Sequence, residues 1–315
     1  MVNPTDGAQG GSKDSSAWPP LPLSAWKDTY ATLHMWMQIV GKIRMALTPP
    51  VNHWWHVPLY VDARGLTTSP IPHGDRQFEI LFDVVERTLR ITGSDGSSKT
   101  LPLSAQPVAA FYADLMAALR DLRIDVKIWP VPVEVPNGIR FTEDYQHASY
   151  DPDSVRRLFQ ILVETDAVFK EFRGRFLGKC SPIHFFWGAF DLALTRFSGR
   201  RAPKRDGADR ITQEAYSHEV ISHGFWPGGE WPGVGTIDSP MYYAYAAPEP
   251  AGFKEASVRP AAAYYSKELS EFLLPYDDVR RAPSPRAALL DFMQSTYEAG
   301  ATLAKWNRDE LERSR

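Results

Sequence analysis

Four stretches of the chain carry apolar residues at the three-to-four-residue spacing of an amphipathic α-helix. We predict helices over residues 24–47, 107–122, 151–177 and 285–308. Ser24 fits the N-cap of the first helix, and Pro49 and Pro50 end it. Asp151 is a good N-cap for the third helix, because Pro152 follows it at the first helical position.

Between these helices lie short aromatic and β-branched runs that favour strands. The predicted strands cover residues 53–61, 77–85, 88–93, 99–103, 126–135, 184–197, 215–225, 241–246 and 271–275. An Asp95-Gly96 turn separates two of them. Prolines interrupt residues 126–135, which therefore read as an edge strand.

The order helix, strands, helix occurs twice, and an aromatic motif follows the first helix of each copy. His53 begins the sequence HWWH in the first copy, and His184 begins HFFW in the second. We therefore predict an α+β fold of two similar halves, each a mostly antiparallel sheet with flanking helices. The halves cover residues 18–150 and 151–315 and share one core, after a disordered tail over residues 1–17. Chance similarity between two aromatic segments is the alternative to duplication.

Composition limits the partners of this protein. The chain has 35 Lys and Arg against 38 Asp and Glu, a formal net charge of −3, which argues against nucleic acid. No apolar run is long enough for a transmembrane helix, so we expect no membrane partner. Cys180 is the single cysteine and the first residues lack the apolar core of a signal peptide, so we expect a cytoplasmic protein. Composition says nothing about its oligomeric state.

Two segments come close to known cofactor motifs without matching them. Residues 174–181 are similar to a phosphate-binding loop, but only three residues separate the glycines and Cys180 replaces the Ser or Thr. His218 and His223 are five residues apart, which does not place them on one face of a helix as a zinc protease requires. No metal site is predicted, and the cofactor is unknown.

The strongest candidate for chemistry is the predicted strand that begins at His184. Alternation along it would put His184 and Arg196 on one face and Asp191 on the other, and a buried Asp191 needs a partner. We take His184, Asp191 and His53 as candidate catalytic residues, with a histidine as acid or base and Asp191 as its orienter. The alternative is structural: a carboxylate paired in the core and imidazoles that donate to backbone carbonyls.

Further residues are candidates for binding a substrate. Arg196 could anchor an anionic group, and Trp55, Trp187 and His223 could line an aromatic pocket. His34, Gln38 and Lys42 are spaced four residues apart on the first helix, next to its apolar face. This polar stripe either lines a cleft or forms a solvated helix face.

Several of these segments also resemble a known family. They are residues 18–22, 32–36, 52–56, 180–188, 190–193, 195–200, 224–228 and 272–276. On these motifs the chain resembles the uncharacterised bacterial proteins grouped as domain of unknown function 5996. The resemblance covers nearly the whole chain after the tail and implies a bacterial origin and a shared fold. It implies no reaction.

Three classes of function stay open. The first is a cofactor-independent enzyme that acts on a small polar or anionic molecule in an aromatic-lined pocket. The second is a non-catalytic module that stacks a ligand on Trp and Tyr, and the third is a structural or interaction protein with exposed aromatic side chains. The first two require the candidate polar residues to converge on one solvent-reachable pocket.

Overall fold

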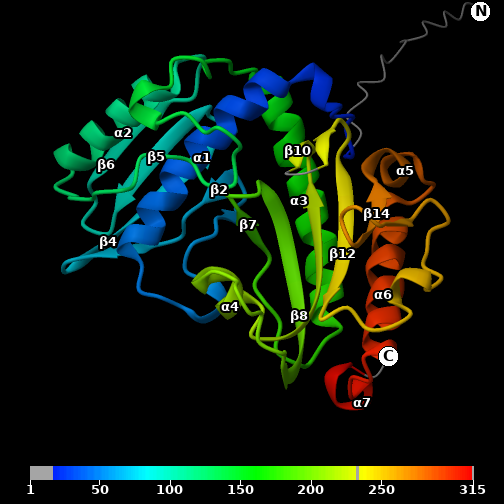
Figure 1. Cartoon of the computed structure of the whole chain (residues 1–315). Coiled ribbons are helices and arrows are strands. Elements are labelled where there is room, and N and C mark those ends of the chain that lie inside the picture. The colour runs from blue at the N-terminus through cyan, green and yellow to red at the C-terminus, as the bar shows by residue number, and fades with distance from the viewer. Residues whose placement is uncertain (1–16, 232–233, 314–315) are drawn as a thin grey trace, which may run out of the picture.

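A computed structural model describes residues 17–231 and 234–313 (Figure 1). The predicted tail lies outside these residues, except for Ala17. All strand pairs in the described part are antiparallel, and helices pack on the sheets, so the predicted α+β class is confirmed. No helix in that part is long and apolar enough to cross a membrane.

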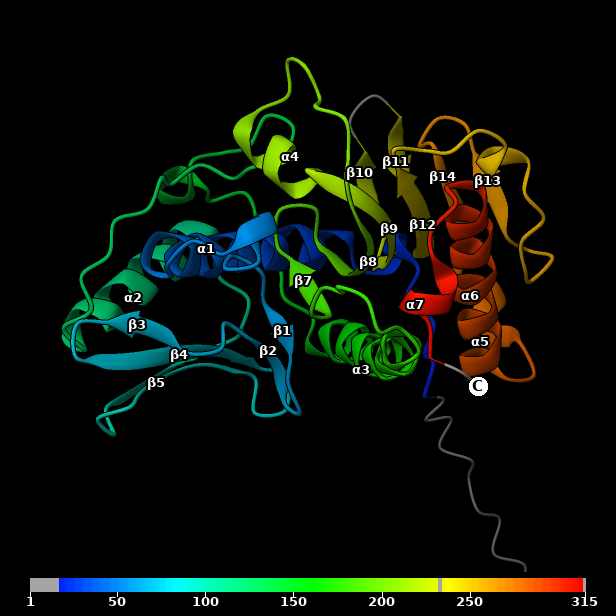
Figure 2. The same cartoon turned by 90° about the horizontal axis from the view of Figure 1, so that it is seen from below.

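The first sheet has the order β1-β2-β4-β5-β6, with β3 paired to β4. Its strands are β1 (Tyr60–Val61), β2 (Gly65–Thr67), β3 (Ile71–His73), β4 (Arg76–Asp83), β5 (Thr88–Gly93) and β6 (Ser98–Pro102). The predicted strand 77–85 is observed as β4, and alternate residues along it, Phe78, Ile80 and Phe82, are all buried. The helices α1 (Lys27–Leu47) and α2 (Val108–Asp121) pack on one face of this sheet (Figure 2). Phe82 lies on that face, because it lines a small cavity together with Leu33 and Met37 of α1.

The second sheet has the order β13-β14-β12-β9-β8-β7. Its strands are β7 (His184–Phe186), β8 (Asp191–Arg201), β9 (His218–Trp226), β12 (Met241–Ala247), β13 (Tyr264–Ser266) and β14 (Glu271–Pro275). Between β9 and β12 the chain forms a small separate hairpin of β10 (Gly229–Trp231) and β11 (Gly235–Ile237).

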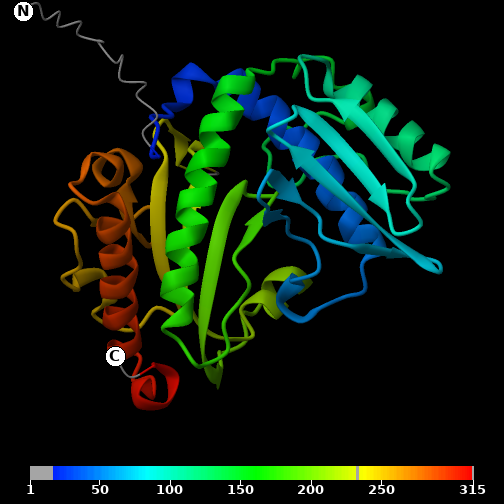
Figure 3. The same ribbon diagram turned by 180° about the vertical axis from the view of Figure 1, so that it is seen from behind.

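Helices lie on both faces of the second sheet. The long helices α3 (Pro152–Gly174) and α6 (Pro285–Leu303) cover one face (Figure 3). Asp151 caps α3 as predicted, since its side chain accepts hydrogen bonds from two backbone N–H groups of the first turn. The short helix α4 (Arg210–Ala215) lies on the opposite face (Figure 2). Two short helices flank α6 along the chain: α5 (Tyr276–Arg281) precedes it and α7 (Arg308–Leu311) follows it.

Helix α1 is the central element of the fold. Most of its side chains are buried, as expected for a helix that packs on several sides. It begins at Lys27 and not at the predicted Ser24, because residues 23–25 form a 3-10 turn, η1 (Leu23–Ala25). One cluster of buried apolar side chains extends from Trp18 to Trp306 and includes residues of both sheets.

The structure does not confirm an internal duplication. His53 lies in a 3-10 turn, η2 (Asn52–Trp54), and only the last two residues of the predicted strand 53–61 pair as β1. His184, its proposed counterpart, lies in a strand. The strand orders of the two sheets also differ. The two sheets meet edge to edge instead, where Leu59 and Phe185 exchange two backbone hydrogen bonds of 2.8 Å.

The predicted edge strand over residues 126–135 is wrong. This segment has neither helix nor strand structure, and it is followed by the short turn η3 (Phe141–Glu143). Its prolines remove backbone donors that a strand ladder would need. The segment is held instead by a side chain of α1, because Gln38 Nε2 donates to the carbonyl of Val133 at 2.7 Å and Gln38 Oε1 accepts from its N–H at 2.9 Å.

The close approach of Trp187 to α1 yields a stability prediction. A Cβ built on Gly41 of α1 would lie 2.2 Å from the Trp187 ring. We expect Gly41→Ala to destabilise the protein by about 1–3 kcal/mol through overpacking, although alanine is the better helix former. Urea unfolding followed by circular dichroism measures this change.

Gly174, the last residue of α3, provides the matched control, because nothing lies within 4 Å of its Cβ position. Gly174→Ala should leave stability unchanged or raise it by up to about 1 kcal/mol. Equal effects of the two substitutions would contradict the close packing of Trp187 on α1.

Candidate functional site

A cavity of about 640 Å³ opens on the face of the second sheet that carries α4. Its floor is formed by β7, β8, β9 and β12, and its walls by α4, residues 133–134 and the chain around η2. Polar and aromatic side chains dominate the lining: His53, Trp54, Trp55, Glu134, His184, Phe186, Trp187, Asp191, Thr195, Phe197, Asp209, Thr212, Tyr216, Ser222, Tyr243 and Tyr245. Five of the sequence-predicted site residues are among them, namely His53, Trp55, His184, Trp187 and Asp191.

A tight turn between β7 and β8 brings His184 and Asp191 to the same face. Phe190 adopts a left-handed conformation (φ 62°), and its N–H donates to the carbonyl of Phe186 at 2.8 Å. Because this turn reverses the chain, His184 pairs with Ala193 and Phe186 with Asp191. The predicted face assignment, with His184 beside Arg196 on one continuous strand, is therefore wrong.

Asp191 is a buried carboxyl with one strong side-chain partner. The hydroxyl of Tyr243, on β12, donates to its Oδ2. Tyr243 reaches Asp191 across β9 because residue 224 is a glycine: a Cβ there would lie 2.1 Å from the Tyr243 ring. No Lys, Arg or His nitrogen among the described residues lies within 4 Å of the Asp191 carboxyl. When Asp191 ionises, no basic side chain among the described residues pairs directly with its charge.

Burial and neighbouring carboxyls favour the protonated form of Asp191. Desolvation, with a contribution from Glu134, raises the pKa of Asp191 to about 7, although the Tyr243 hydrogen bond opposes this rise. Glu134 lies at the rim of the cavity, and desolvation raises the pKa of its carboxyl too. An adjoining cavity of about 180 Å³ shares Asp191 and Tyr243 and adds Glu271, whose pKa burial and Asp191 raise to about 8. With Asp209 in the wall of the larger cavity, four carboxyl groups therefore line these two adjoining cavities.

His184 faces the same cavity but is not bonded to Asp191. It is 1% exposed, and its Nδ1 atom has no hydrogen-bond partner. Burial lowers the pKa of His184 to about 3, so the imidazole is neutral at physiological pH. The predicted pair, with Asp191 orienting a histidine through a hydrogen bond, is absent from the described residues.

His53 is held at the rim of the cavity by two polar contacts. Its Nδ1 lies 3.3 Å from the carbonyl oxygen of Ala215 on α4, and its Nε2 accepts from Lys179 Nζ at 2.8 Å. Burial and the Lys179 charge lower the pKa of His53. The ring of Trp55 lies between the two histidines, with centroids 5.2 Å from His53 and 6.4 Å from His184.

His34 does not line the cavity, but it contacts the backbone of two residues that do. Its Nε2 lies 3.0 Å from the carbonyl oxygen of Trp187 and 2.9 Å from that of Gly188, both in the β7–β8 turn. Burial lowers the pKa of His34 to about 4, so the neutral imidazole can donate from Nε2. The alternative of a solvated helix face is wrong, because His34, Gln38 and Lys42 are all buried.

Arg196 and His223 lie on the opposite face of the sheet, so the eight candidate residues do not form one pocket. The side chains of both residues point from β8 and β9 towards the face of the sheet that α3 and α6 cover. The Nη2 of Arg196 donates to the carbonyl of Phe172 on α3, and His223 Nε2 lies 3.0 Å from Thr296 Oγ1 on α6. An anion anchored by Arg196 could not occupy the Asp191 cavity.

Sequence reasoning missed Glu134, Tyr243 and Glu271. The last two could have been found, since strict alternation along β12 and β14 puts them on the face of Asp191 once strand order is known. Glu134 carries no such signal, because it lies in irregular chain with a positive φ of 59°. Among the described residues, no group of three or more His, Cys, Asp or Glu could hold a metal ion.

The fold and the cavity define an α+β protein with an acidic, aromatic-lined cavity on one face of an antiparallel sheet. The chain belongs to the family described as a family of unknown function, DUF5996, whose model matches residues 18–313. This finding confirms the family resemblance of its motifs. No curated protein and no solved structure matches the chain significantly.

The raised pKa of Asp191 predicts a pH-dependent stability. The folded protein keeps this proton up to about pH 7, whereas the unfolded chain loses it near pH 4, so the stabilisation falls as pH rises between these values. Asn carries no such proton. The free energy of unfolding of Asp191→Asn, minus that of the wild type, should therefore rise from pH 4 to pH 8. The expected slope is about 1.4 kcal/mol for each pH unit that lies between the unfolded and folded pKa values.

Urea unfolding at several pH values measures this difference. Thr195→Val, a non-titrating change in the same cavity, is the control and should give a difference that does not vary with pH. If the difference in the free energy of unfolding between Asp191→Asn and the wild type does not vary with pH, the Asp191 carboxyl is ionised at neutral pH.

Proposed function

We propose that the cavity binds a small organic cation, with its charged group near Asp191 and its apolar part against the surrounding aromatic rings. The observation that carries the proposal is the buried Asp191 carboxyl, which faces the cavity without a basic partner. A buried charge of this kind is costly unless it is paired. A ligand cation would supply the missing partner.

The composition of the walls supports a cation over an anion. Within the described part of the chain, no Lys or Arg lines the cavity, although Lys179 reaches its rim at His53. Three carboxyl groups line the cavity, from Glu134, Asp191 and Asp209, and Glu271 lies in the adjoining space. Aromatic rings attract cations, as Lys179 over Trp55 and Lys42 over Trp187 show, at 5.3 Å and 5.9 Å from the ring centroids. Tyr243 and Tyr245 add further rings next to Asp191. The expectation of an anionic substrate held by Arg196 does not suit this cavity, because Arg196 lies behind the sheet.

Binding of a cation would be linked to proton release. The pKa of Asp191 is about 7, so below this pH the ligand must displace the carboxyl proton into solvent. We therefore expect affinity to rise with pH between about 6 and 8 and then to level off.

A matched pair of probes tests the proposal. Choline and 3,3-dimethylbutan-1-ol have nearly the same shape, but only choline is charged. Isothermal titration calorimetry should show choline binding at least about tenfold more tightly, and Asp191→Asn should abolish this preference. Thr195→Val again serves as the control, since it changes the same wall without changing its charge. Equal affinities of the two probes for the wild type would overturn the proposal.

A second candidate function is acid–base catalysis in the same cavity. It is favoured by a carboxyl whose pKa lies near 7 and by His184, whose Nδ1 has no partner. In this proposal Asp191 exchanges a proton with the bound molecule, and His184 and His53 are further candidates. Conversion of a bound ligand by the wild type, its loss in Asp191→Asn and a rate that follows one ionisation near pH 7 would distinguish an enzyme from a binding module.

A further inference from the structure

A second, larger cavity lies on the other face of the same sheet. Its volume is about 940 Å³, and it opens between the C-terminal end of α3, α6 and the last residues of the described chain. The charged and polar residues that line it are Arg175, Arg196, Arg259, Asp291, Gln294, Tyr297, Glu312 and Arg313. The Asp191 cavity shares none of them.

Positive charge exceeds negative charge in this lining, in a chain whose formal net charge is −3. Both carboxylates already have cationic partners. Asp291 lies 3.3 Å from Arg259, and Glu312 accepts from Arg308 at 2.5 Å and from the Tyr297 hydroxyl at 2.9 Å. Neither carboxylate lies within 4 Å of Arg196 or Arg313, so among the described residues these two guanidinium groups form no direct ion pair, although Glu312 attracts Arg196 from further away.

Arg196 is a deeply buried residue of the cavity lining. It is 1% exposed, and its guanidinium carbon lies 3.4 Å from the Phe172 ring centroid and 4.4 Å from that of Tyr297. Its Nη2 donates to the carbonyl of Phe172, but its Nε has no partner. Stacking orients the guanidinium without cancelling its charge, and a buried charge without a directly paired counter-ion is costly.

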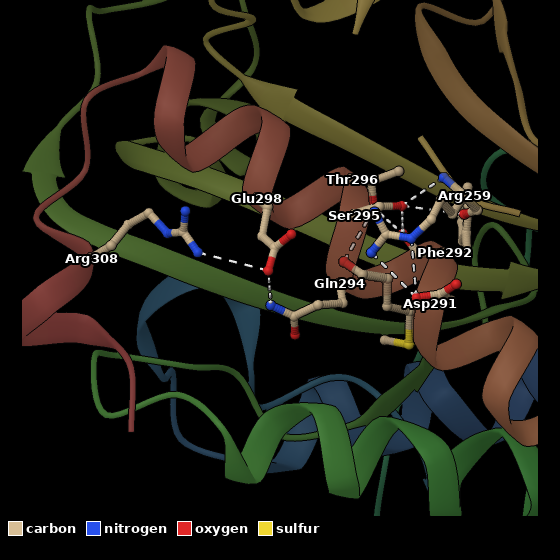
Figure 4. A network of polar contacts seen from close by, with 9 residues as sticks. Arg259, Asp291, Phe292, Gln294, Ser295, Thr296, Glu298 and Arg308 are labelled. Carbon is tan, nitrogen blue, oxygen red and sulfur yellow. Dashed lines mark hydrogen bonds and ion pairs between the residues drawn. The ribbon is translucent and has the colours of Figure 1, made fainter. Parts of the chain in front are cut away.

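The wall formed by α6 is organised by polar contacts (Figure 4). Gln294 donates from Nε2 to Glu298 at 2.9 Å, and Glu298 lies 3.8 Å from Arg308. The backbone of Arg259 is held against α6, because its N–H donates to Ser295 Oγ at 2.9 Å. The Oε1 atom of Gln294 is buried and has no partner, so an acceptor for a ligand hydroxyl lies in the same cavity as Arg196.

We infer that this cavity is a binding site for a small organic anion, whose phosphate or carboxylate group pairs with Arg196 and whose hydroxyl groups reach Gln294. Arginine suits this role because its planar fork of donors matches both anionic groups. Arg313 and Arg259 at the entrance attract the anion. The site is independent of the cation proposed for the opposite face.

Titration at constant ionic strength tests the inference. The probes are inorganic phosphate and malonate, which distinguish a phosphate site from a carboxylate site, and chloride replaces them in the reference samples. Calorimetry and thermal unfolding should show saturable binding of at least one probe. Arg196→Met, which keeps the volume of the side chain, should weaken this binding at least about tenfold.

Further variants cover the case that Arg196→Met does not fold. Arg313→Gln and Arg259→Gln change exposed arginines and should each weaken binding severalfold. Arg120→Gln, on the exposed surface of α2, is the matched control and should have no effect. Asp191→Asn should also leave anion binding unchanged, which separates this site from the proposed cation site. Absence of saturable binding of both probes, or equal weakening by Arg120→Gln, would overturn the inference.

Discussion

The hydrogen bonds of two buried polar side chains on α1 determine where the cavity walls lie. His34 contacts the carbonyl oxygens of the β7–β8 turn, and Gln38 binds both backbone groups of Val133. Such groups are costly to bury unless they are paired, so the helix, the turn and the irregular segment depend on one another. The turn carries Trp187, and the segment carries Glu134. Packing of α1 into the core therefore positions two sides of the Asp191 cavity.

Strand β8 separates two opposite electrostatic environments. Asp191 points to a cavity with further carboxyls, and Arg196, five residues later, points to one lined by arginines. A strand places odd and even residues on opposite faces, so this short segment serves both sites. Each charge is buried without a full counter-ion on its own side. The sheet between them is the low-dielectric layer that keeps the two from pairing.

Hydrophobic periodicity made the main helices and strands predictable from the sequence. Segments without regular secondary structure could not be predicted in this way. The α1 and α3 helices, the Asp151 cap and the buried face of β4 follow from spacing and capping chemistry. The turn at Phe190 does not, because a left-handed conformation at a phenylalanine leaves no trace in hydrophobic alternation. This one turn decided which residues share a cavity. It joined His184 to Asp191 and put Arg196 behind the sheet.

The contact between Leu59 and Phe185 also affects how the molecule meets other chains. Strands β1 and β7 are edge strands, and an open edge offers unpaired N–H and C=O groups to any extended peptide. Because Leu59 and Phe185 use these groups on each other, each edge blocks the other at this point. Loss of this contact would leave two aromatic-flanked edges open to pairing between molecules. The bridge thus occupies backbone groups that an extended segment of another molecule could otherwise pair with.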